Sequence, residues 1–235
     1  MIGLNASITS QHIETDRCYC RLPDGPTELE HALLTVMPLR SKSVDREAMA
    51  AHRRQVAWAF DLIESVRSDR PMFVMTHVVS PHPPFVFAED GAERIGQEVF
   101  TYFDGDGFPG SRHDYVTGYR KQATFILNRT VELIERIIAR SPSAIIVVHS
   151  DHGPGLGLVN TDAGATDAWE RLSIFSAYYA GGRSDEVPED ISPVNALRWA
   201  LRTALGAELP LLPNRSYLSD YLRPYRWQEI PVHSQ

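Results

Sequence analysis

Hydrophobic residues recur at intervals of three and four positions in two long segments, which is the periodicity of one face of an α-helix. This spacing predicts helices over residues 44–66 and 114–140. Asp45 lies in the first turn of the earlier helix, where the helix dipole favours an acidic side chain. A short helix over residues 27–34 and a longer one over residues 193–205 complete the predicted helices.

Short runs of apolar residues separate these helices and predict buried β-strands. The runs lie at residues 72–79, 144–148 and 172–179, and a further short strand is predicted over residues 2–8. Segments rich in polar residues, Gly and Pro predict loops at residues 9–26, 88–112 and 153–169. From residue 209 onward the pattern has no clear period, so no element is predicted there.

The alternation of helices and strands predicts an α/β fold with a mostly parallel sheet sandwiched by helices. A chain of 235 residues is long enough for one substantial core, and we expect a single domain over residues 1–235. Ligands of such sheets bind at the carboxyl ends of the strands. We therefore expect His82 to lie on the same edge as Asp151 and His152, because each group follows a predicted strand.

Composition argues against some classes of partner but does not identify one. The formal net charge of −7 argues against a general nucleic-acid surface or an anionic-membrane surface. No apolar run approaches the roughly 20 residues that span a bilayer. The first ten residues, MIGLNASITS, lack the basic and apolar regions of a signal peptide. The sequence therefore predicts neither a membrane span nor a signal peptide, and it does not predict a cellular location.

Polar residues crowd the end of the predicted strand at 144–148, where the sequence continues His-Ser-Asp-His-Gly-Pro-Gly. The carboxylate of Asp151 and the imidazole of His152 suit zinc, and also manganese. Gly153 and Gly155 would allow a close backbone approach and positive φ angles. A metal site needs three or four ligands, so an Asp-His pair after a strand is also compatible with chance. His149 is interpreted as a core histidine.

A second candidate, His82, lies between Pro81 and Pro83, which stiffen the backbone around it. Its imidazole could donate a hydrogen bond to an oxygen of an anionic substrate, such as a phosphate or a sulfate. The alternative is that His82 is simply a residue of the turn.

Three stretches resemble the sulfatase-like branch of the alkaline phosphatase superfamily, which includes lipoteichoic acid synthases and phosphoethanolamine transferases. VVHSDHG resembles the family's metal-binding motif, PMFVMTHVVSPHPPFVF its substrate-binding strand and turn, and ERLSIFSAYYAGG the strand that follows. The resemblance implies that Asp151 and His152 bind a divalent metal ion (zinc, manganese, magnesium or calcium). It also implies that His82 binds the substrate, an anionic sulfate or phosphate ester, in a hydrolase or transferase.

The resemblance covers the C-terminal half of such a catalytic domain. In these relatives a membrane anchor, a nucleophile and a further acidic ligand lie upstream of the part that is resembled here. Thr9 and Ser10 do not match the position of the nucleophile, and Cys18 and Cys20 lack the Cys-x-Pro-x-Arg context of sulfatases. We therefore expect a sulfatase-like domain that is incomplete at its N-terminal side, and the nucleophile stays unassigned.

Two interpretations remain open at this point. In the first, a missing N-terminal half or another copy of the chain completes an enzyme. In the second, the chain is a non-catalytic binding module or an inactive fragment. A separate class, the α/β hydrolases, would require a Gly-x-Ser-x-Gly turn, which the sequence does not contain.

Overall fold

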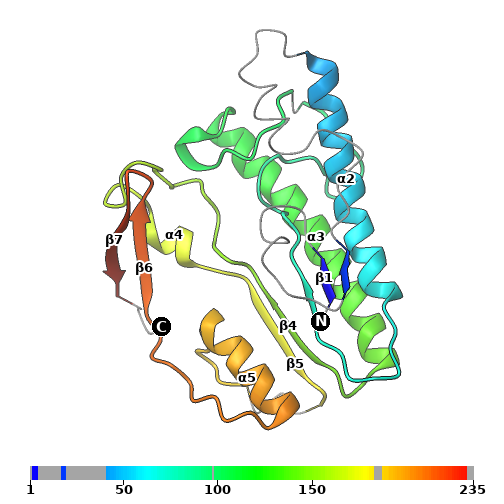
Figure 1. The fold of residues 1–235 in the computed structure, drawn as a ribbon. Coiled ribbons are helices and arrows are strands. Elements are labelled where there is room, and N and C mark those ends of the chain that lie inside the picture. The colour runs from blue at the N-terminus through cyan, green and yellow to red at the C-terminus, as the bar shows by residue number, and fades with distance from the viewer. Residues whose placement is uncertain (1, 5–16, 20–40, 97, 183–186, 232–235) are drawn as a thin grey trace. The chain divides into compact units, whose positions relative to one another are not determined.

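The chain forms two compact units in the computed structural model (Figure 1). The structure describes residues 2–4, 17–19, 41–96, 98–182 and 187–231. The first unit comprises residues 1–103 and 109–133, and the second comprises residues 104–108 and 134–235. The prediction of a single domain over residues 1–235 is not tested by this division and stays a prediction. The helix predicted at 27–34 lies outside the described residues.

Helix α2 (Lys42–Ser65) forms much of the first unit and confirms the helix predicted at 44–66. It begins after Ser41, and its buried face includes Met49, Val56 and Phe60. Besides its favourable interaction with the helix dipole, the buried carboxylate of Asp45 accepts a hydrogen bond from the Phe100 backbone N–H at 2.8 Å. The first turn of α2 is thereby tied to a segment 55 residues further along the chain.

Helix α3 (Arg112–Arg140) confirms the helix predicted at 114–140, and its residues up to Leu133 belong to the first unit. Ser111 and Asp114 cap its start reciprocally. The Asp114 carboxylate accepts from the Ser111 backbone N–H at 3.0 Å, and the Ser111 hydroxyl accepts from the Asp114 N–H at 3.1 Å. This exchange satisfies N–H groups at the helix start that have no partner within the helix.

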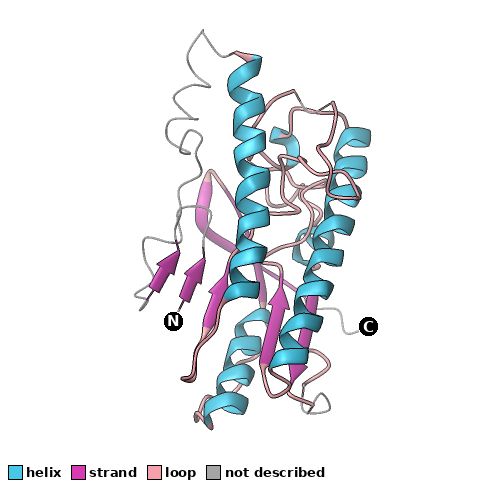
Figure 2. Ribbon diagram, turned by 90° about the vertical axis from the view of Figure 1, so that its right-hand side faces the viewer, coloured by secondary structure: helices cyan, strands magenta, loops and turns pink. Residues whose placement is uncertain are grey.

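The sheet of the first unit is small and parallel. Strand β1 (Ile2–Leu4) lies between β2 (Arg17–Tyr19) and β3 (Val74–Thr76). Each strand has three residues, which is short beside the helices (Figure 2). The run at 72–79 pairs over only three residues. Pro71 on one side and Pro81 on the other lack the backbone N–H that a sheet ladder requires.

The second unit contains an antiparallel pair of strands with a helix against it. Strand β4 (Ile145–His149) pairs with β5 (Ser176–Ala180), with Ile145 opposite Ala180 and His149 opposite Ser176. Helix α5 (Pro193–Leu205) contacts β4, and Gly206 ends it in the left-handed conformation (φ 65°). Helix α4 (Ala168–Leu172) lies between β4 and β5 along the chain. A short 3₁₀ turn, η2 (Gly105–Gly107), also belongs to this unit.

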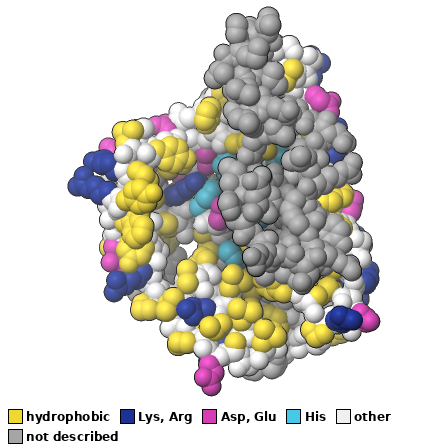
Figure 3. All heavy atoms as spheres, in the orientation of Figure 1, with side chains coloured by type: hydrophobic (Ala, Val, Ile, Leu, Met, Phe, Trp, Pro, Cys, Tyr) yellow, Lys and Arg dark blue, Asp and Glu magenta, His cyan; other side chains and the backbone are white. Residues whose placement is uncertain are grey.

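A hairpin follows where no element was predicted. Strands β6 (Ser216–Asp220) and β7 (Arg223–Ile230) pair antiparallel, and seven of the eight residues of β7 are exposed. Tyr225 and Trp227 alternate with Arg226 and Gln228, but neither face of β7 is buried and the pattern is too short to predict a strand from the sequence. The Tyr221 N–H at the hairpin turn bonds the Asn160 carbonyl at 2.9 Å. Figure 3 shows hydrophobic and basic side chains gathered over this hairpin.

The prediction of a mostly parallel sheet sandwiched by helices is wrong. The described strands form three separate sheets, and both sheets of the second unit are two-stranded and antiparallel. Strand β5 runs back along β4 because the segment between them contains only the five-residue helix α4, rather than the long crossover helix of a parallel βαβ unit. Strands β3 and β4 thus belong to different sheets, so the shared sheet edge expected for His82, Asp151 and His152 loses its basis.

In the part of the chain that the structure describes, helices are too short or too polar to cross a membrane.

Candidate functional site

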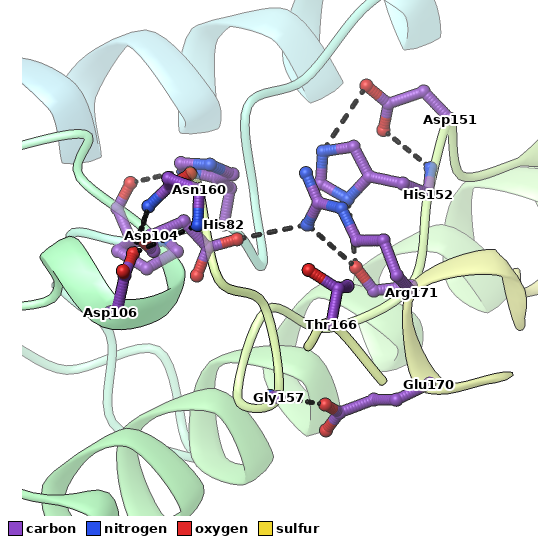
Figure 4. A network of polar contacts seen from close by, with 12 residues as sticks. His82, Asp104, Asp106, Asp151, His152, Gly157, Asn160, Thr166, Glu170 and Arg171 are labelled. Carbon is purple, nitrogen blue, oxygen red and sulfur yellow. Dashed lines mark hydrogen bonds and ion pairs between the residues drawn. The ribbon is translucent and has the colours of Figure 1, made fainter. Parts of the chain in front are cut away.

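Asp151 and His152 lie in the turn that follows β4, in the second unit (Figure 4). The Asp151 carboxylate turns back toward its neighbour, since its Oδ1 accepts a hydrogen bond from the His152 backbone N–H at 3.1 Å. Its other oxygen, Oδ2, lies 3.6 Å from His152 Nε2. The Asp151 side chain is 72% exposed and that of His152 is 31% exposed. The pair is therefore open to an ion or a ligand from solvent.

The hydrogen bond of His152 Nδ1 selects the tautomer of the neutral ring. Nδ1 lies 2.8 Å from the Gly153 carbonyl oxygen, which can only accept, so Nδ1 carries the proton. In the neutral ring Nε2 then has the lone pair, and Nε2 is the atom that faces Asp151. Metal-binding histidines commonly have this arrangement, in which one ring nitrogen donates to a carbonyl and the other binds the ion.

The gap between the two side chains matches a shared ion better than a direct hydrogen bond. A separation of 3.6 Å between Asp151 Oδ2 and His152 Nε2 is too long for a good hydrogen bond. Two ligand atoms on one tetrahedral zinc ion lie about 3.3 Å apart, given zinc–ligand distances near 2.0–2.1 Å. The pair thus fits two positions of a metal site. Among the described residues, however, no cluster of three or more His, Cys, Asp and Glu could hold an ion.

Gly153 and Gly155 allow the close approach that the sequence predicted, but neither has the positive φ that was also expected. A Cβ at position 153 would overlap the Glu170 carbonyl oxygen and lie 2.5 Å from the Ser173 carbonyl oxygen. A Cβ at position 155 would overlap the Asp104 carboxylate. These positions require glycine because other segments pack directly on the turn, and the backbone conformation alone does not require it.

Arg171, on α4, forms hydrogen bonds with the same turn. Its Nη1 lies 3.3 Å from the Gly153 carbonyl oxygen and 3.1 Å from Asp104 Oδ2 (Figure 4). Its own carbonyl accepts from the Gly153 N–H at 2.7 Å. The Asp104 side chain is 8% exposed and that of Arg171 is 18% exposed, so this ion pair is largely removed from water.

Polar contacts also order the loop that leads from Gly155 to α4. Glu170 accepts from the Gly157 N–H at 2.6 Å, and Thr166 accepts from the Val159 N–H at 3.0 Å. The Asn160 side chain donates to Asp106 at 2.6 Å and to the Asp104 carbonyl at 3.0 Å. This loop, predicted at 153–169 as irregular chain, is therefore fixed by side-chain bonds within the second unit.

His82 belongs to the first unit, where a buried glutamine holds the segment around it. Gln122 of α3 is fully buried, and its amide donates to the carbonyls of His82 (3.1 Å) and Pro84 (3.3 Å). The same side chain accepts from the N–H groups of Val86 (2.7 Å) and Phe87 (3.1 Å). The His82 ring, whose Nδ1 lies 2.7 Å from the Pro83 carbonyl oxygen, is held on a fixed backbone.

Tyr102 lies between two histidines of the first unit. Its ring centroid is 6.4 Å from that of His82 and 5.8 Å from that of His52. His52 is 2% exposed, and burial lowers its pKa to about 4, with the nearby charges of His82 and Arg53 acting in the same direction. His52 is therefore neutral at pH 7. Its ring packs against Tyr102, which in turn packs against His82.

Sequence reasoning missed Gln122, Arg171 and Asp104 as parts of these two arrangements. Gln122 lies within the helix predicted at 114–140, where its only sequence signal is a polar residue on an otherwise apolar helix face. Asp104 and Arg171 are 67 residues apart, and nothing in their spacing indicates that they meet. His149, interpreted as a core histidine, is instead exposed, with Nδ1 3.2 Å from the Ser150 carbonyl oxygen.

No nucleophile can be assigned from the described residues. Thr9, Ser10 and Cys20 lie outside them.

Comparison of the chain with family models, with curated proteins and with solved structures found no match to any of them. The resemblance to the sulfatase-like branch therefore rests on the quoted motifs alone and stays a hypothesis.

Proposed function

We propose that the chain carries part of the site of a metal-dependent hydrolase or transferase that acts on sulfate or phosphate esters. Asp151 and His152 would hold a divalent metal ion, and His82 would bind the ester. The observation that supports this most is the geometry of the Asp151–His152 pair, with Oδ2 and Nε2 facing each other at 3.6 Å and Nδ1 tied to a carbonyl.

The donor atoms favour zinc or manganese over magnesium or calcium, because an imidazole nitrogen suits the former and oxygen ligands suit the latter. A bound divalent ion would supply Lewis-acid chemistry at the ester. The Asp151 carboxylate would offset part of the ion's charge, and the Gly153 carbonyl would hold the proton of the neutral His152 ring on Nδ1, which leaves the Nε2 lone pair for the ion. A catalytic zinc site uses three protein ligands, so at least one more ligand is needed beyond this pair.

The role of His82 follows from the hydrogen bond of its Nδ1. Because Nδ1 is bonded to the Pro83 carbonyl oxygen, the ring can donate from Nε2 only when it is protonated. His82 would thus meet an ester oxygen as an imidazolium, and its positive charge would add to the hydrogen bond.

The alternative function is a non-catalytic module that binds a metal or an anion without turnover. The small number of ligands favours it, since Asp151 and His152 supply two donors and none of the described clusters supplies three. In this case the same pair would bind an ion weakly from solvent, and ester hydrolysis would be absent.

Hydrolysis of 4-nitrophenyl phosphate and 4-nitrophenyl sulfate separates the two functions. The assay compares wild type and Asp151→Asn with zinc, with manganese and with a chelator. Metal-dependent hydrolysis that Asp151→Asn abolishes would support the enzyme. Metal binding without hydrolysis would support the binding module. If wild type neither binds metal nor hydrolyses either ester, the proposed role of the pair is wrong.

A further inference from the structure

We propose that Arg171 is a positioning residue for His152, acting through the Gly153 peptide and held in place by Asp104. This inference rests on the proposed function, because it treats His152 as a metal ligand. It concerns the residues that fix the ligand, which the motif around Asp151 and His152 does not contain.

Arg171 forms hydrogen bonds with both backbone polar groups of Gly153. The Gly153 N–H donates to the Arg171 carbonyl at 2.7 Å, and the Arg171 guanidinium donates to the Gly153 carbonyl at 3.3 Å. That carbonyl also accepts the proton of His152 Nδ1 at 2.8 Å. The guanidinium of Arg171 and the imidazole of His152 therefore donate to the same carbonyl oxygen, and this shared acceptor connects the two side chains.

Asp104 in turn holds the guanidinium. Asp104 Oδ2 lies 3.1 Å from the same Nη1 atom that reaches Gly153, and the two side chains are 8% and 18% exposed. A charged pair that is this far removed from water is costly to break, because the mutual attraction of the two charges offsets part of the cost of removing each from water. Asp104 also packs on Gly155, where a side chain would overlap its carboxylate. The Asp104–Arg171 pair thus contacts the turn at both glycines, with Arg171 at Gly153 and Asp104 at Gly155.

A fixed carbonyl matters because it selects which ring nitrogen of His152 can bind a metal. With the Gly153 carbonyl in place, Nδ1 keeps the proton and Nε2 stays a ligand that faces Asp151. If the peptide rotates, the ring can exchange between its two tautomers and lose this orientation. Removing an outer partner of a metal-binding histidine typically weakens metal affinity by about 10- to 100-fold.

The test compares wild type with Arg171→Met and Arg171→Lys. The methionine keeps an unbranched apolar stem and loses every donor, whereas the lysine keeps the charge and can reach one of the two acceptors. We expect Arg171→Met to weaken zinc binding by about 10- to 100-fold and Arg171→Lys to recover part of the loss. Arg202→Met is the matched control, because Arg202 is an exposed arginine of α5 in the same unit, and it should leave zinc affinity unchanged.

A second readout does not depend on metal. Nitrogen-15 NMR of the His152 ring in the metal-free protein at pH 8 should show the proton on Nδ1 in wild type and a mixture of tautomers in Arg171→Met. Should Arg171→Met fail to fold, Asp104→Asn and Arg171→Lys carry the same comparison, since both keep hydrogen-bonding groups. Folded variants with the Nδ1 tautomer and wild-type zinc affinity would overturn the proposal. Wild type that binds no zinc would contradict the proposed function, while the NMR comparison would still decide the role of Arg171.

Discussion

His52 is the one fully buried histidine in the part of the chain that the structure describes, and its environment makes it sensitive to acid. It lies on α2 against the rings of Phe100 and Tyr102, with centroids 6.1 Å and 5.8 Å away. Burial lowers its pKa from 6.5 to about 4, and the charges of His82 and Arg53 assist. The folded protein therefore resists a proton that the unfolded chain accepts readily.

We predict that His52 lowers the stability of the protein as the pH falls from about 6.5 to about 4. Over this range the unfolded chain binds a proton that the folded protein does not, so the free energy of unfolding decreases. The shift corresponds to a loss of about 3 kcal/mol at pH 4, and to none above pH 7. Urea denaturation at a series of pH values checks this, with His52→Gln removing the pH-dependent loss.

The matched control for this prediction is His113→Gln, which replaces an exposed histidine of α3 in the first unit. His113→Gln should keep the wild-type dependence of stability on pH. Equal slopes in wild type and His52→Gln between pH 6.5 and pH 4 would contradict the account of His52.

At His82 we predict that replacing the imidazole weakens the binding of inorganic phosphate or sulfate. The ring would donate to the anion from Nε2, because Nδ1 is bonded to the Pro83 carbonyl oxygen. Calorimetric titration of phosphate measures this. The affinity of His82→Gln should be lower than that of wild type, and a variant with wild-type affinity would exclude His82.

At the scale of elements, Gln122 joins α3 to the segment that carries His82. We predict that Gln122→Leu, which keeps a similar volume, leaves the N–H groups of Val86 and Phe87 buried without their acceptor. Each such group costs about 1–3 kcal/mol, so the free energy of unfolding should fall by several kcal/mol. Lys121→Leu, at the neighbouring exposed position of α3, is the control and should change stability little. A loss below about 1 kcal/mol in Gln122→Leu would show that this side chain is not what holds the segment.

The turn after β4 depends on its two glycines for space. We predict that Gly153→Ala and Gly155→Ala each destabilise the second unit by about 1–3 kcal/mol, because the added Cβ overlaps the Glu170 carbonyl or the Asp104 carboxylate. Both variants should also weaken metal binding, since the turn carries Asp151 and His152. Gly164→Ala is the control, because its nearest contact is a side-chain oxygen at 3.3 Å. Unchanged thermal unfolding and zinc affinity in Gly153→Ala and Gly155→Ala would contradict the packing described here.

The long helices could be predicted from the sequence because their signals are local. Val56 and Phe60 of α2, four residues apart, lie on its buried face, and α3 begins at a cap formed by neighbours in sequence, Ser111 and Asp114. The hairpin of β6 and β7 could not be predicted, because β7 is exposed almost throughout and its apolar-polar alternation is confined to residues 225–228. Its turn is fixed by a bond from Tyr221 to the distant Asn160.

At the scale of the whole molecule, strand pairing was the feature that the sequence could not supply. Helices between apolar runs suggested one parallel sheet, but β3 pairs with β1, while β4 pairs antiparallel with β5. Pairing is decided by contacts between distant segments, which a single sequence does not record. The same limit applies to the candidate site. The local motif predicted Asp151 and His152, whereas the Asp104–Arg171 pair that braces them joins residues 67 positions apart.

The stoichiometry of zinc and manganese on the purified chain tests most directly whether Asp151 and His152 together hold a metal ion. Equilibrium dialysis would compare wild type with Asp151→Ala and with the control Asp162→Ala, which replaces an exposed carboxylate elsewhere in the second unit. We predict about one tightly bound ion per wild-type or Asp162→Ala chain, and the loss of this ion in Asp151→Ala. Equal metal content in all three proteins, or no specific metal in wild type, would contradict this prediction.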